Sequence, residues 1–222
     1  MDTHGLVIFD LDGTLLNTLD DLADAVNHTL GEYGFPPKST EHIRRSVGNG
    51  AANLLRQCVP GGSEHPEFEA CLESYKDYYQ KNLLIKTRPY DGIPELLAAL
   101  RRRGIRIAVL SNKPDDAVKS LVREIFGPEI AAAAGESEQN RRKPSPDGVF
   151  QILRELGVSA GNTIYIGDSD VDVMTAHNAG LKAVGVTWGF RGRGVLESAG
   201  ADYIIDRPEE LDRLIGDGSI RL

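Results

Sequence analysis

The spacing of apolar residues changes twice along the chain and divides it into three stretches. Residues 5–9 form a continuous apolar run that ends at Asp10, which is typical of a buried parallel strand. Over residues 16–84, apolar positions recur every three or four residues without a strand pattern, and this predicts an all-helical segment. From Arg88 onward, apolar runs alternate with helical spacing. The chain is therefore expected to form an α/β core, residues 1–15 and 85–222, with a helical segment inserted after the first strand.

Four helices are expected in the inserted segment. Thr18 is placed to cap the first, and Gly31 lies just past its expected end. Gly48 and Gly50 mark a break between the second and the third. The apolar residues that define the four helices are Leu19, Leu22, Ala23, Val26 and Leu30, then Ile43 and Val47, then Leu54, Leu55 and Cys58, and last Phe68, Cys71, Leu72, Tyr75 and Tyr79.

Strands and helices alternate in the rest of the chain. Strands are expected at residues 105–110, 163–166, 183–187 and 202–205, with helices between them. Ser145 and Pro146 are expected to be the N-cap and first residue of one helix, which Gly157 ends. This alternation predicts a Rossmann-like parallel sheet covered on both faces, and ligands of such sheets bind at the carboxyl ends of the strands.

Composition narrows the functional classes. The 222 residues carry 25 Lys and Arg against 33 Asp and Glu, a net charge of −8, and such a surface repels nucleic acids and anionic lipids. No segment approaches the ~20 apolar residues that span a bilayer, and the amino terminus lacks the basic and apolar regions of a signal peptide. A cytoplasmic protein is therefore expected, with Cys58 and Cys71 as free thiols. The histidines lack the spacing of a zinc site.

Acidic and hydroxyl side chains directly follow three of the expected strands. The three stretches are Asp10-Leu11-Asp12-Gly13-Thr14-Leu15, Ser111-Asn112-Lys113 and Gly167-Asp168-Ser169-Asp170-Val171-Asp172. Each aspartate taken singly is also consistent with a helix cap. If the strands are neighbours, however, the carboxylates converge and repel one another unless a cation neutralises them. Oxygen ligands without histidine or cysteine favour a hard cation, and Mg²⁺ is the expected one.

Four motifs of the chain resemble, in order and spacing, the signature of the haloacid dehalogenase superfamily. They are residues 9–15, 110–113, 142–146 and 166–172, so the resemblance covers essentially the whole chain. The inserted segment, residues 16–84, is similar to the small helical cap of that superfamily. Within the superfamily the chain most resembles phosphoglycolate phosphatases, through two further stretches. These are Val47-Gly48-Asn49-Gly50-Ala51 and Gly185-Val186-Thr187-Trp188-Gly189-Phe190-Arg191.

The resemblance implies a role for each acid at the strand ends. Asp10 corresponds to the nucleophile, which becomes an aspartyl phosphate, and Asp12 corresponds to the general acid and base. Mg²⁺ would be bound by Asp10, by the backbone carbonyl of Asp12 and by Asp168. Asp172, one helical turn later, would bind the metal or orient its waters.

The resemblance also implies a phosphate clamp and a cap that selects the substrate. Ser111, Asn112 and Lys143 correspond to the clamp, although Lys143 taken alone is more typical of a solvated lysine in a basic loop. In the cap, the candidates for substrate contact are Arg44, Arg45 and Asn49, since an arginine fork suits a small carboxylate. Either arginine taken singly is slightly more typical of an exposed helix face.

The implied activity is the Mg²⁺-dependent hydrolysis of a small phosphomonoester, with 2-phosphoglycolate as the expected substrate. A sugar-phosphate phosphatase or mutase, a pyrophosphatase and a nucleotidase share the same core and stay open. A non-catalytic module predicts a broken nucleophile or clamp, and both are intact here. The expected partner is a small phosphorylated metabolite, without nucleic acid or membrane, and the expected state is a monomer or homodimer. Trp188 fits the cleft and the core equally well, and Asp170 is interpreted as a surface or supporting acid.

Overall fold

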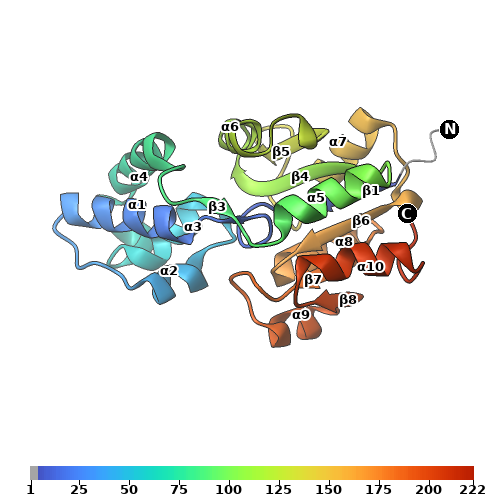
Figure 1. Cartoon of the computed structure of the whole chain (residues 1–222). Helices are drawn as coiled ribbons and strands as arrows, with labels where there is room; N and C mark the ends of the chain where they lie inside the picture. Colours follow the sequence, from blue (N-terminus) through green and yellow to red (C-terminus); the bar gives the residue numbers. More distant parts are fainter. Residues whose placement is uncertain (1–4) are drawn as a thin grey trace. The chain divides into compact units, whose positions relative to one another are not determined.

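Six short strands form one parallel sheet in the first and last parts of the chain. The structure is a computed structural model and describes residues 5–222. The strand order is β5-β4-β1-β6-β7-β8, and the pairs between neighbours are parallel (Figure 1). The strands are β1 (Leu6–Phe9), β4 (Arg106–Pro114), β5 (Ala132–Glu136), β6 (Thr163–Gly167), β7 (Lys182–Val186) and β8 (Tyr203–Ile205). The expected α/β class is confirmed.

The middle of the sheet brings three strand ends together. Phe9, the last residue of β1, pairs with Val109 of β4 on one side and with Ile166 of β6 on the other. The next residue, Asp10, donates its backbone N–H to the Ile166 carbonyl at 2.8 Å. Because all three strands run in the same direction, the residues that follow them meet at one edge of the sheet.

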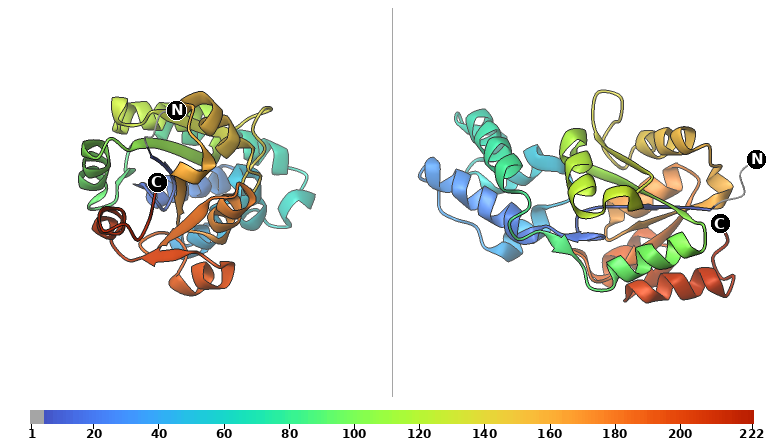
Figure 2. Two further views of the ribbon diagram at one scale, coloured as in Figure 1. Left: turned by 90° about the vertical axis from the view of Figure 1, so that its right-hand side faces the viewer. Right: turned by 45° about the horizontal axis from the view of Figure 1, so that its top comes forward.

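Helices cover both faces of this sheet. α5 and α10 pack against each other on one face, and α7 and α8 lie on the opposite face (Figure 2, left view). Ile8, Val149 and Val173 belong to one buried cluster between the sheet and the second pair. The helices of this part are α5 (Ile93–Arg102), α6 (Asp115–Ile125), α7 (Asp147–Leu156), α8 (Asp170–Asn178), α9 (Arg193–Ala199) and α10 (Pro208–Gly216), with short 3₁₀ helices at Gly127–Glu129 and Ala160–Asn162.

The inserted segment is helical, as its apolar spacing predicts. Its helices are α1 (Leu19–Glu32), α2 (Thr40–Ser46), α3 (Gly50–Cys58) and α4 (Phe68–Asn82), with a 3₁₀ turn at Gly62–Glu64. The buried residues of α4 are the five that the sequence singles out. Cys58 and Cys71 are free and buried, and burial raises the pKa of the Cys58 thiol to about 11.

The chain separates into two compact units. One contains the residues up to Leu16 together with Pro89–Leu222, and the other is Asn17–Arg88. These boundaries lie one and four residues after the expected ones. The two chain segments that join the units pair as a two-stranded sheet, β2 (Leu16–Asn17) with β3 (Arg88–Pro89).

A buried carboxylate fastens the end of the helical unit to its beginning. Asp21 of α1 is 3% exposed and accepts hydrogen bonds from the backbone N–H groups of Lys86 at 3.0 Å and Thr87 at 2.8 Å. Since a charged acceptor makes the stronger kind of hydrogen bond, this contact fixes the chain where it leaves the helical unit.

Two expectations about the sheet need correction. β5 (Ala132–Glu136) was not expected, because its alanines have low strand propensity and show no alternation; it forms through parallel pairing with β4 at the edge of the sheet. β4 also continues to Pro114 instead of ending at Leu110, so that Ser111 and Lys113 belong to the strand itself.

Three helix ends also differ from expectation. The Thr18 side chain makes no capping hydrogen bond, and the Asn17 side chain accepts one from the Leu19 N–H at 3.3 Å instead. α1 continues to Glu32, so that Gly31 lies in its last turn. α7 begins at Asp147, one residue later than expected. In the described residues 5–222, no helix has the length and apolar character needed to cross a membrane.

Candidate active site

Three aspartates gather where β1 and β6 end. Asp10 follows β1, Asp168 follows β6, and Asp172 lies in the first turn of α8. One carboxylate oxygen of each lies within 4.8 Å of the others, and all three residues are buried. The sheet order explains this meeting, because β1 and β6 are neighbours and end at the same edge. The predicted convergence of Asp10 with Asp168 is therefore present.

A buried lysine contacts two of these three acids. The Nζ atom of Lys143 is 2.8 Å from Oδ1 of Asp10 and 2.7 Å from Oδ1 of Asp172, and only 4% of its side chain is exposed. It also donates to the hydroxyl of Tyr165 on β6 at 3.2 Å. A buried ammonium needs opposite charges as partners, and two carboxylates supply them here. The solvated-lysine alternative is thus inconsistent with the position of Lys143.

The acids outnumber the cation, and their proton affinities rise as a result. Burial, with the neighbouring Asp172, raises the pKa of Asp10 well above its usual range. The same two causes raise the pKa of Asp168 to about 7. Burial alone would lower the pKa of Lys143, but the charges of Asp10 and Asp172 outweigh it and raise that pKa. Three carboxylates facing one ammonium fit a site that takes a further cation.

Hydrogen bonds from nearby residues fix the orientation of Asp172 and Asp168. Ser169 and Asp172 form a reciprocal capping box at the start of α8, in which Asp172 Oδ2 accepts from the Ser169 N–H at 3.1 Å and hydroxyl at 2.6 Å. Oδ1 of Asp172 is thereby left to Lys143 and to the Tyr165 hydroxyl, which donates to it at 3.4 Å. Asp168 accepts a hydrogen bond from the Phe190 N–H at 2.5 Å. Oxygen donors held in this way suit Mg²⁺ more than a softer metal.

The end of β4 completes the constellation. Ser111 is 3% exposed, and its hydroxyl accepts from the Lys113 N–H at 3.3 Å. The Asn112 amide holds the backbone of Lys143, accepting from its N–H at 2.7 Å and donating to its carbonyl at 3.4 Å. Nζ of Lys113 lies 3.1 Å from Oδ1 of Asp12. These contacts join the residues of β4 to Lys143 and to Asp12.

Two glycines let the loop after β7 approach the loop after β1. A Cβ atom on Gly189 would lie 2.2 Å from the Gly13 carbonyl oxygen and 2.4 Å from Cβ of Asp168. Gly13 itself has a φ of 82°, which favours glycine. Next to it, the Trp188 indole N–H donates to the Thr14 carbonyl at 3.0 Å. Trp188 therefore braces the loop that carries Asp12.

The three candidate residues of the helical unit lie on α2 and at the start of α3. Nε of Arg44 and Nε of Arg45 are each 2.7 Å from a carboxylate oxygen of Glu41, one turn earlier. These hydrogen bonds lower the pKa of Glu41 to about 2. Asn49 is the residue that precedes α3. A substrate carboxylate would compete with Glu41 for either arginine.

Sequence reasoning missed Lys113, Tyr165 and Phe190. Lys113 belongs to the motif Ser111-Asn112-Lys113, which sequence reasoning identified. A lysine directly after two predicted phosphate ligands was therefore a usable signal. Tyr165 lies among the apolar residues of a strand, and Phe190 binds Asp168 through its backbone N–H. Neither role depends on a local sequence pattern.

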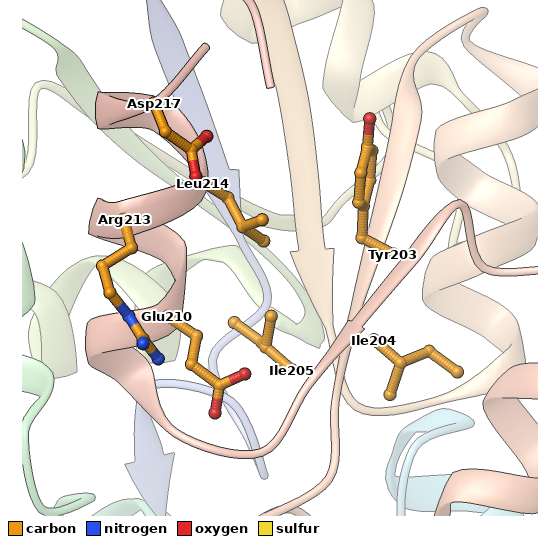
Figure 3. A pocket seen from close by; sticks show the side chains of 7 residues that line it. All are labelled: Tyr203, Ile204, Ile205, Glu210, Arg213, Leu214 and Asp217. Carbon is orange, nitrogen blue, oxygen red and sulfur yellow. The ribbon is translucent and has the colours of Figure 1, made fainter. Parts of the chain in front are cut away.

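A hollow of ≈ 360 Å³ lies elsewhere, between β8 and α10 (Figure 3). Its lining side chains include Tyr203 and Ile205 from the strand and Glu210 and Arg213 from the helix. β8 is the edge strand, two positions away from β6, so that this hollow is separate from the aspartate cluster. The cluster is the better candidate for chemistry, because it concentrates buried charge.

Comparison with known proteins agrees with this geometry. A family model described as haloacid dehalogenase-like hydrolase matches residues 7–186, a stretch that contains Asp10, Lys143 and Asp172. The chain belongs to this family. As a haloacid dehalogenase-like hydrolase it has the strand-end acids and the buried lysine that the sequence motifs predict for the superfamily.

Curated relatives and solved structures extend over nearly the whole of this hydrolase. It is 33% identical over 207 residues to the phosphoglycolate phosphatase of Pseudomonas putida, covering 90% of this chain and 76% of that protein. It is 30% identical over 207 residues to the N-acetylmuramic acid 6-phosphate phosphatase of Pseudomonas aeruginosa, covering 92% of each. A crystal structure from Lactobacillus delbrueckii subsp. bulgaricus, provisionally named a phosphoglycolate phosphatase, is similar with a TM-score of 0.90 and 34% identity, covering 96% and 98% of the two chains.

Proposed function

We propose that this hydrolase is a Mg²⁺-dependent phosphatase of small phosphomonoesters that works through an aspartyl phosphate. The observation that carries the proposal is the buried Lys143, whose Nζ lies 2.8 Å from Asp10 in a cluster with Asp168 and Asp172. An ammonium at that place neutralises an anion beside the nucleophile, which is what an incoming phosphate requires.

Each half-reaction uses one acid as nucleophile or leaving group and the other as proton carrier. In the first, a carboxylate oxygen of Asp10 attacks phosphorus, the bond from phosphorus to the alcohol oxygen breaks, and Asp12 gives its proton to that oxygen. In the second, Asp12 takes a proton from a water whose oxygen attacks phosphorus, and the bond to Asp10 breaks. The products are the alcohol and inorganic phosphate.

The cation and the clamp have separate tasks in this proposal. Asp10, Asp168, Asp172 and the backbone carbonyl of Asp12 would hold Mg²⁺, which supplies charge neutralisation for the phosphoryl group when bound. Ser111 and Lys143 would bind the phosphoryl oxygens. Asn112, a predicted phosphate ligand, would act through its two hydrogen bonds to the Lys143 backbone.

We propose 2-phosphoglycolate as the substrate, because the relatives of that name match most of this chain. N-acetylmuramic acid 6-phosphate is a second candidate, since this chain covers 92% of the length of a phosphatase of that name from Pseudomonas aeruginosa. Both molecules combine a phosphomonoester with a carboxylate. The shared class is thus a phosphorylated small acid. We also propose that the protein is cytoplasmic and binds neither nucleic acid nor membranes.

The helical unit, which we propose acts as a cap, would choose between these substrates. Arg44, Arg45 and Asn49 are its candidate residues for the leaving group. Replacing Arg44 by methionine should then raise KM for a carboxylate-bearing substrate while leaving KM for a neutral sugar phosphate unchanged. Equal KM changes for both substrates would contradict this role.

A phosphate-release screen tests the function. It compares 2-phosphoglycolate, N-acetylmuramic acid 6-phosphate, β-glucose 1-phosphate, pyrophosphate and nucleoside monophosphates, each with Mg²⁺ and with a chelator. Asp10→Asn should abolish turnover and leave the thermal unfolding transition in place. Undiminished turnover by that variant would contradict the mechanism, and poor rates with both phosphorylated acids would contradict the substrate class.

A further inference from the structure

The site contains a second buried lysine, and its partner differs from that of Lys143. The side chain of Lys113 is 9% exposed, and its Nζ lies 3.1 Å from Oδ1 of Asp12, whose own side chain is 12% exposed. Lys143 contacts Asp10 and Asp172 instead. Each acid of the motif after β1 thus has its own ammonium, and the two lysines come from different segments of the chain.

The burial of Lys113 argues against an ordinary surface ion pair. Exposed pairs contribute ~0–1 kcal/mol and hold their side chains only loosely. Lys119, which lies six positions after Lys113, forms such an exposed pair. It pairs with Asp115 at 2.7 Å, but 55% of its side chain is exposed. Removing water from Lys113 and Asp12 makes their attraction stronger and their geometry more fixed.

The position of Lys113 in the strand fixes where its charge lies. β4 continues through this residue, and the Lys113 N–H donates to the Ser111 hydroxyl at 3.3 Å. The backbone of Lys113 therefore belongs to the same strand end as Ser111, while its side chain reaches the loop after β1. One residue links the proposed phosphate clamp to the proposed proton carrier.

We infer that Lys113 is the positioning residue of the general acid and base: it holds one oxygen of Asp12, so that the carboxyl presents its proton to the oxygen of the departing alcohol. The inference rests on the proposed phosphatase function and adds a residue to it. Lys113 forms and breaks no bond in the reaction. It sets the orientation of Asp12 in both half-reactions, whereas Lys143 serves the nucleophile.

Leaving groups of different basicity distinguish this role from phosphate binding. An alkoxide must receive a proton as it departs, but the nitrophenolate of p-nitrophenyl phosphate leaves without one. The value of kcat/KM reports the steps up to departure of the leaving group, so a badly oriented Asp12 should lower it for alkyl phosphates only. In contrast, kcat also includes cleavage of the aspartyl phosphate, in which Asp12 serves as base for every substrate.

The experiment compares Lys113→Met with Lys119→Met as the matched control, using 2-phosphoglycolate or the best alkyl phosphate of the wild type and p-nitrophenyl phosphate. We expect Lys113→Met to lower kcat/KM for the alkyl phosphate by about 100-fold and for the aryl phosphate by less than about 3-fold, since positioned acids contribute ~10²–10⁴-fold. Lys119→Met should leave both values unchanged. The thermal unfolding temperature checks that each variant is folded.

Three results would overturn the inference. An equal loss for both substrates would assign Lys113 to the phosphoryl group, and no loss for either would make it a structural pair. If Lys113→Met does not fold, Lys113→Arg is used instead, because it retains a cation. Its ratio of kcat/KM for the alkyl phosphate to kcat/KM for the aryl phosphate should stay near that of the wild type. A ratio as low as that of Asp12→Asn would be the third contrary result. A wild type inactive on every phosphomonoester would instead refute the proposed phosphatase function.

Discussion

Replacing Asp168 with asparagine should make the metal-free protein more stable at neutral pH. In the folded chain the pKa of Asp168 is about 7, against 3.8 for the ordinary carboxyl group, because the side chain is buried and faces Asp172. The folded state therefore binds this proton more tightly than the unfolded state does. Asparagine carries no charge and retains an oxygen that can accept the Phe190 N–H.

The magnitude follows from the difference between the two pKa values. About 3 units at ~1.4 kcal/mol each give a cost of ~4 kcal/mol for the ionised carboxyl group, an upper limit because water that enters the metal-free site solvates the charge. The cost is absent below about pH 4, grows between about pH 4 and 7, and is constant above that range. The advantage of Asp168→Asn should then be about twice as large at pH 7.5 as at pH 5.5.

Chemical denaturation in a chelating buffer at these two pH values measures the effect. The control is Asp170→Asn, which changes an exposed acid in the same stretch and should shift the free energy of unfolding by less than ~1 kcal/mol. Mg²⁺ should reverse the order, since it stabilises the wild type more than Asp168→Asn. A metal-free Asp168→Asn variant that is less stable than the wild type, or an advantage independent of pH, would refute the reasoning.

Two further predictions concern residues that hold the site without belonging to the reaction. Gly189→Ala should cost ~1–3 kcal/mol or more of stability and most of the activity, because its Cβ would lie 2.2 Å from a backbone oxygen. Gly192→Ala is the control, since its Cβ would meet nothing within 4 Å. Denaturation midpoints and kcat of the two variants are compared. Tyr165→Phe removes the hydroxyl bound to Lys143 and should weaken inhibition by inorganic phosphate several-fold, while the free energy of unfolding falls by only ~1 kcal/mol. An unchanged inhibition constant would exclude this role for the hydroxyl.

The sequence by itself determined the elements that rest on local spacing. The buried residues of α4 are those at helical intervals, and the strand that ends at Asp10 is a plain apolar run. These two inferences need only residues that are close together in the chain. The sequence also placed Asp10 and Asp168 at strand ends, and the resemblance to the superfamily added Asp172, but the sequence by itself did not show that the two strands are neighbours.

Only the tertiary structure decided which distant groups pair. β5 is a strand because β4 lies beside it, and its alanines alone do not specify one. That Lys143 contacts Asp10, and that Lys113 contacts Asp12, depends on side chains more than 100 positions apart in the chain meeting where both are largely buried. Sequence spacing carries no information about such contacts, because burial and charge balance arise only after the whole sheet has assembled.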